Sequence, residues 1–98
     1  MMAGRIFYKE GVMGTLTREA RRGFGKLALA YFAKGLDFLV TSVREGTHSP
    51  YSLHPLGLAW DYDSQGVSIE YDKMILGPDY DVIEESNHRH AELDPKGI

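Results

Sequence analysis

The sequence predicts a small single domain of the α+β class. Its 98 residues match the length of one domain. One segment has the three- and four-residue apolar spacing of an amphipathic helix, and several shorter segments are β-prone or alternate between apolar and polar residues. We therefore expect one domain over residues 1–98, with an N-terminal arm at 1–15 and a frayed tail at 94–98.

The longest helix is expected to run from Thr17, a good N-cap, to about Lys34. Gly35 is well placed to end it, whereas Gly23 and Gly25 should weaken it. The apolar residues at helical spacing are Phe24, Leu27, Ala28, Tyr31 and Phe32. One face of this helix is therefore expected to be buried.

Short strands are expected on both sides of a polar loop at 44–50. Residues 5–9 fit either an edge strand or an ordered arm, and residues 67–77 fit either a strand or a short helix. The remaining predicted strands cover 37–42, 58–62, 80–84 and 89–93, with turns at 63–66 and at Ser86-Asn87.

Charge and composition exclude several kinds of partner and site. The net charge of -3 argues against a nucleic-acid partner, since phosphates are bound by clustered positive charge. The chain has no cysteine, so a metal would be held by histidine and carboxylate. No apolar run is long enough for a membrane span, and residues 1–14 lack the apolar core of a signal peptide. We therefore expect the protein to be cytoplasmic at synthesis.

Two segments far apart in the chain carry the candidate chemistry. In a strand over 58–62, alternation places Trp60 on the core face and Asp61 on the opposite face. Gly57 lets the backbone turn, so that His54 can reach the same point as Asp61.

The second segment contains His88 and His90, which share one side of a strand because they lie two residues apart, while Arg89 points away. Together His54, Asp61 and His90 offer two imidazoles and one carboxylate. Three protein ligands with an open water position are the usual form of a catalytic zinc site. Zinc is therefore the expected cofactor.

Simpler interpretations apply to single histidines. His48 reads as polar surface, and an H-x-H pair alone is weak evidence for a metal. The combined spacing of the two segments is what favours metal binding.

The spacing S-x-H-x-x-G-x-A-x-D, here from Ser52 to Asp61, is followed by H-x-H at 88–90. This pattern resembles that of the zinc peptidases that include D-alanyl-D-alanine carboxypeptidases, phage L-alanyl-D-glutamate endopeptidases and the hedgehog signalling domain. Small phage and prophage members are the most similar in pattern, and the resemblance extends over roughly residues 28–96.

The resemblance implies a small antiparallel sheet with helices packed on one face, and Zn2+ ligation by His54, Asp61 and His90. It also implies hydrolysis of a peptide bond in bacterial peptidoglycan, with a stem peptide as the substrate. The zinc ion would activate a water molecule and polarise the scissile carbonyl. Such a protein would be phage-associated or released to the cell wall.

The resemblance leaves the catalytic base open. Relatives often carry Asp or Glu three residues before the last ligand, where this chain has Asn87, and an apolar residue where it has Arg89. Glu85 is the first candidate base and His88 the second; a protonated His88 would instead stabilise the oxyanion. The alternatives are a catalytically weak or inactive zinc-containing module that binds the cell wall or a protein, and a plain structural domain.

Ser52 and Arg44 are candidates for supporting roles. Ser52 is expected either to orient His54 through a hydrogen bond or to stabilise the turn. Arg44 is expected either to bind a substrate carboxylate or to form a surface ion pair with Glu45 or Asp63.

Overall fold

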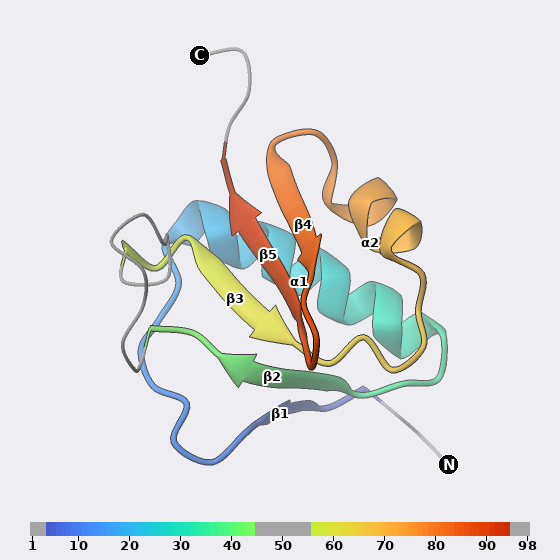
Figure 1. Ribbon diagram of the computed structural model, residues 1–98, viewed down its shortest axis with the longest axis horizontal. Coiled ribbons are helices and arrows are strands. Elements are labelled where there is room, and N and C mark those ends of the chain that lie inside the picture. Colours follow the sequence, from blue (N-terminus) through green and yellow to red (C-terminus); the bar gives the residue numbers. More distant parts are fainter. Residues whose placement is uncertain (1–3, 45–55, 95–98) are drawn as a thin grey trace.

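The computed structural model describes residues 4–44 and 56–94. Along the chain these form β1 (Ile6–Tyr8), α1 (Arg18–Ala33), β2 (Phe38–Ser42), β3 (Ala59–Tyr62), α2 (Ile69–Leu76), β4 (Tyr80–Glu84) and β5 (Arg89–Leu93). The strands make one sheet in the order β1-β2-β3-β5-β4, and both helices lie on one of its faces (Figure 1). The predicted α+β class is confirmed.

The sheet is mixed, which corrects the expectation of a wholly antiparallel one. Strands β2, β3, β5 and β4 pair antiparallel, but β1 runs parallel to β2, with Ile6 opposite Phe38. The chain passes through α1 between β1 and β2, and parallel neighbours need such a crossover. Of the two interpretations of residues 5–9, the edge strand is therefore the one observed.

The ends of the helices follow the capping residues in the sequence. Thr17 Oγ1 accepts a hydrogen bond from the backbone N–H of Ala20 at 3.3 Å, as expected of the N-cap of α1. The ambiguous segment 67–77 contains α2, which is capped by Ser68 through a 3.2 Å bond from the backbone N–H of Tyr71. Neither helix in the described part of the chain is long and apolar enough to cross a membrane.

Gly23 lets β4 approach α1 closely. Its backbone N–H donates to the hydroxyl of Tyr80 at 3.1 Å, and this hydroxyl donates to the carbonyl oxygen of Glu19 at 2.9 Å. A Cβ atom at Gly23 would collide with the Tyr80 ring. The glycine that lowers helix propensity is therefore required by packing.

The hydrophobic core lies between the sheet and the two helices. Its largest fully buried apolar and aromatic side chains are Trp60, Tyr31, Tyr62, Phe38, Leu27 and Val40. Phe38 packs edge-to-face against both Phe24 and Tyr31, with 5.3 Å between ring centroids in each pair. These contacts hold α1 against β2.

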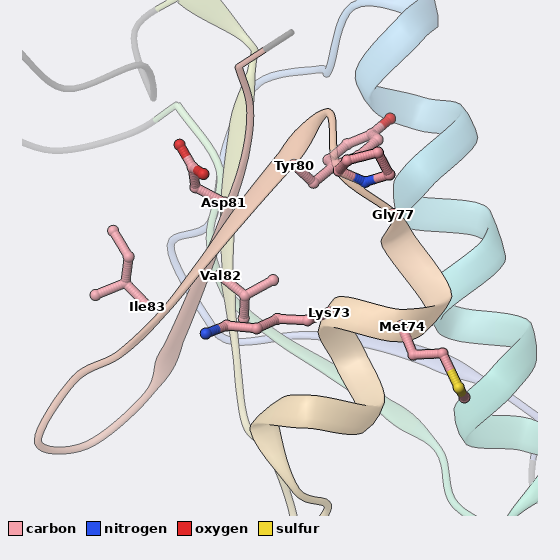
Figure 2. Close-up of a pocket in the computed structure, with 8 residues that line it drawn as sticks. Lys73, Met74, Gly77, Tyr80, Asp81, Val82 and Ile83 are labelled. Atoms are coloured by element: carbon pink, nitrogen blue, oxygen red, sulfur yellow. The ribbon is translucent and has the colours of Figure 1, made fainter. Parts of the chain in front are cut away.

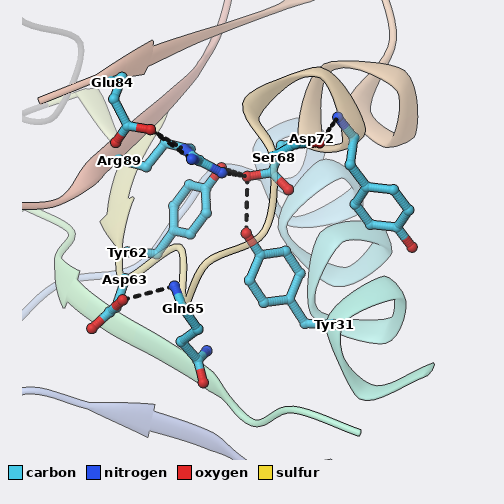
Figure 3. A network of polar contacts seen from close by, with 9 residues as sticks. Tyr31, Tyr62, Asp63, Gln65, Ser68, Asp72, Glu84 and Arg89 are labelled. Atoms are coloured by element: carbon cyan, nitrogen blue, oxygen red, sulfur yellow. Dashed lines mark hydrogen bonds and ion pairs between the residues drawn. The ribbon is translucent and has the colours of Figure 1, made fainter. Parts of the chain in front are cut away.

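A buried carboxylate joins both helices to the sheet. Asp72 of α2 is fully buried, and its Oδ2 accepts hydrogen bonds from the Tyr31 hydroxyl at 2.9 Å, from the Tyr62 hydroxyl, and from Arg89 Nη1 at 2.8 Å (Figure 3). Arg89 also donates to Glu84 Oε1 through Nη2 at 2.6 Å and through Nε at 3.1 Å. One oxygen of α2 thus receives donors from α1, β3 and β5.

The protonation states of this network are held by its surroundings. Burial and the negative charge of Asp72 raise the pKa of Tyr31 and of Tyr62, so both keep the protons that they donate. Burial lowers the pKa of Arg89, but its bonds to Glu84 and Asp72 outweigh burial and raise that pKa overall. Arg89 therefore remains charged inside the core.

We expect Asp72→Asn to destabilise the fold by roughly 3–5 kcal/mol, because it leaves the charge of Arg89 without its buried partner. Glu84→Gln is the matched control. The Glu84 side chain is 52% exposed, so its loss should cost about 1 kcal/mol or less. Urea unfolding of both variants measures the difference, and equal losses would contradict a dominant role for Asp72.

Candidate metal centre

Asp61 lies on the face of the sheet opposite the helices. Its neighbours Trp60 and Tyr62 belong to the core, so alternation along β3 turns Asp61 the other way, as predicted. Asp61 is nevertheless only 9% exposed. Its carboxylate is therefore shielded from water, which strengthens its interactions with nearby groups.

His90 of β5 meets Asp61 directly. The two residues are opposite each other in the β3–β5 ladder, and His90 Nδ1 lies 2.8 Å from Asp61 Oδ1. The other ring nitrogen, Nε2, lies 2.7 Å from Glu92 Oε1. The structure thus brings together two of the three predicted metal ligands, which are 29 residues apart in the chain.

His88 contacts the same carboxylate from the turn before β5. Its Nε2 lies 3.5 Å from Asp61 Oδ2, and its Nδ1 lies 2.6 Å from Asn87 Oδ1. Arg89, between the two histidines, points into the core and is 4% exposed. The predicted alternation of this segment is confirmed.

His54, the third predicted ligand, lies outside the described residues, as do Ser52 and His48. The described chain resumes at Leu56, and Gly57 has a φ of 71°. That left-handed conformation favours glycine and produces the turn expected just before β3.

The two remaining predicted site residues lie on exposed parts of the chain. Glu85 is exposed in the turn between β4 and β5, where its backbone N–H donates to the carbonyl oxygen of His88 at 3.0 Å. Arg44 is exposed after β2, and the stem of its side chain lies against Gly14. Of the two candidate bases, His88 is the one in contact with Asp61.

A polar groove of about 230 Å³ opens beside Asp61 and His88. It is also lined by Lys9, which follows β1, and by Thr41 and Ser42 of β2. These side chains supply an ammonium group and two hydroxyls. The groove can therefore accept a polar ligand next to the Asp61–His90 contact.

The charge of His90 depends on its two carboxylate partners. Burial alone lowers the pKa of His90, but its hydrogen bonds to Asp61 and Glu92 outweigh burial, and the net effect raises the pKa. Without a metal, the ring therefore tends to hold a proton on each nitrogen. A metal that binds at Nδ1 has to displace one of them.

Glu92 is the residue at this site that the sequence analysis missed. Its signal is the H-x-E spacing after His90, because residues two apart on a strand share one face. Carboxylate oxygens of Asp81, Glu92 and Asp94 also lie within 4.8 Å of one another. This acidic group was not predicted either, and exposed acidic groups are common without a metal.

A second cavity, of about 630 Å³, lies between the C-terminal part of α2 and strand β4. Figure 2 shows Val82 turned toward α2 and its neighbours Asp81 and Ile83 turned away from the helix. Asp81 faces Glu92 and Ile83 faces His90 in the β4–β5 ladder. The cavity runs along this edge strand, and its lining shares no residue with the groove beside Asp61.

In the metal-free protein, we expect protonated His90 to stabilise the fold at mildly acidic pH. Its folded pKa is raised above the ~6.5 of a free imidazole, so the contribution is fully present below about pH 6.5 and is lost as the pH rises through the folded value. With a chelator present, the free energy of unfolding in urea should fall over this range. It should fall less in His90→Gln, and identical pH profiles would contradict the assignment.

No family model, no curated protein and no solved structure matches this chain. A functional assignment therefore rests on the motif spacing and on the geometry of this chain.

Proposed function

We propose that the protein is a zinc-dependent peptidase that hydrolyses a peptide bond in bacterial peptidoglycan. His54, Asp61 and His90 would hold the metal, and the fold would be a hedgehog/DD-peptidase-like one with an added parallel edge strand. The observation that carries the proposal is the 2.8 Å contact between Asp61 and His90. The motif spacing predicts that these two residues share one ion.

The donor atoms at this contact are compatible with a shared zinc ion. Zinc binds nitrogen and oxygen ligands at about 2.0–2.1 Å, so two ligand atoms at a tetrahedral centre lie roughly 3.3 Å apart. His90 Nδ1 and Asp61 Oδ1 would have to separate by only about half an ångström to admit the ion. Imidazole with carboxylate is also a donor set that zinc accepts.

When bound, zinc would supply polarisation of the scissile carbonyl and acidification of a bound water. His88 is the residue best placed to take the proton from that water. If Nδ1 of His88 donates to Asn87, the neutral ring presents an unprotonated Nε2 on the side of Asp61. In this arrangement Asn87 orients the base, so an acidic residue at that position is not required.

The groove beside Asp61 supports a peptide substrate. Lys9 offers a positive charge for a substrate carboxylate, and peptidoglycan stem peptides carry such groups. The hydroxyls of Thr41 and Ser42 can form hydrogen bonds to an extended backbone. Arg89, the departure from the family pattern between the histidines, is buried in the core and leaves this groove unchanged.

The second candidate function is a zinc-containing module that binds the cell wall or a protein without turnover. Asn87 in place of an acidic residue and the exposed position of Glu85 favour it. The two functions share the metal site and differ only in whether a proton acceptor is present. They are therefore separated by measuring turnover in the metal-loaded protein.

We expect the purified protein to retain about one equivalent of zinc. His90→Ala and Asp61→Ala should each lose most of it, because each removes one of three ligands. His48→Ala is the matched control and should retain the metal. Elemental analysis after dialysis measures all four proteins; zinc retained by both ligand variants would contradict the proposed centre.

For turnover, we expect His88→Ala to lower kcat by about 10²–10⁴-fold, as for loss of a general base, with zinc content unchanged. Glu85→Gln should remain close to the wild type. Release of new amines from purified peptidoglycan measures both. A large loss in Glu85→Gln alone would assign the base to Glu85, and a zinc-loaded wild type without turnover would favour the binding module.

A further inference from the structure

Glu92 holds the imidazole nitrogen of His90 that faces away from Asp61. The hydrogen bond between Glu92 Oε1 and His90 Nε2 is 2.7 Å long, and the hydrogen bond between Asp61 Oδ1 and His90 Nδ1 is 2.8 Å long. The side chains of His90 and Glu92 are 12% and 20% exposed. The ring is thus held between two largely shielded carboxylates, one on each nitrogen.

Strand geometry keeps Glu92 at this position. Glu92 and His90 are two residues apart on β5 and so share the face of the sheet opposite the helices. β5 is an inner strand, since β3 and β4 pair with it on either side, with Ala59 and Asp81 opposite Glu92. The backbone beneath the Glu92–His90 contact is therefore fixed by two ladders of hydrogen bonds.

We propose that Glu92 is a positioning residue that commits His90 to bind the metal through Nδ1; this inference rests on the proposed zinc site. A neutral imidazole has one N–H donor and one nitrogen lone pair. A carboxylate at Nε2 retains the proton there, so the lone pair lies on Nδ1 and points at Asp61. When the metal binds, the proton on Nδ1 is released to solvent and the bond from Nε2–H to Glu92 remains.

Glu92 also belongs to the acidic group with Asp81 and Asp94, so a test of its role must separate that group from the contact with His90. Its Oε1 lies 2.7 Å from His90 Nε2. Carboxylates that accept from a ligating histidine orient the ring and raise its basicity, and their loss typically weakens metal binding 10–100-fold.

The first test measures zinc affinity by competition with a chelator, using the full chain. Glu92→Met, which keeps the length and removes the acceptor, should bind zinc about 10–100-fold more weakly. Glu92→Gln, which keeps an acceptor oxygen, should lose less. Asp81→Leu is the control, because it removes one charge opposite Glu92 and leaves the bond to His90; its affinity should change about fivefold or less.

The second test needs no variant. In the zinc-loaded wild type, the ¹⁵N chemical shifts of the His90 ring should show Nδ1 bound to metal and Nε2 protonated. Binding through Nε2, or equal weakening by Asp81→Leu and Glu92→Met, would overturn the role of Glu92 and leave the zinc site standing. A wild type that binds no zinc would overturn both. Neither readout depends on peptidase activity.

Discussion

The buried ion pair between Asp72 and Arg89 is the interaction on which the rest of this fold depends. Asp72 Oδ2 receives donors from α1, β3 and β5. A charged group in the interior is stable only when it is paired and hydrogen-bonded. Any displacement of α2 or of β5 would leave one of these charges without its partner, so the pair fixes how the helices sit against the sheet.

The same ion pair decides which way the histidines face. Arg89 points into the core, so His88 and His90 on either side of it point to the opposite face. A slip of one residue in β5 would turn both histidines inward and expose Arg89. The side chains that build the core and those of the proposed metal centre therefore lie on opposite faces of β5, and Arg89 sets the register of this strand.

On the sheet face opposite the helices, the protonation of His90 depends on the carboxylates around it. Asp61 and Glu92 flank its ring on both nitrogens, and burial shields them from water. This arrangement raises the pKa of His90 and so favours a protonated imidazole. His88 and Asn87 then form a separate pair at the edge of the same groove.

Periodicity and capping residues made the ends of most helices and strands predictable, and the alternation of side chains along the strands predicted that Asp61 and His90 lie on one face of the sheet. Thr17 marked the start of α1, and alternation placed Asp61 opposite Trp60 and in line with His90. The parallel pairing of β1 was not predictable in this way, because it depends on where α1 returns the chain. The role of His54 stays a prediction, since it lies outside the described residues.

By itself, the sequence determined which residues share a face, because that depends on the local repeat of a strand or a helix. It also determined that two distant segments carry imidazole and carboxylate groups, which are both donors that zinc accepts. The tertiary structure alone decided that Asp72 is the partner of Arg89, that Gly23 is needed by Tyr80, and that Glu92 completes the surroundings of His90. Each of these contacts joins groups whose distance is set by packing and strand register, which no local pattern encodes.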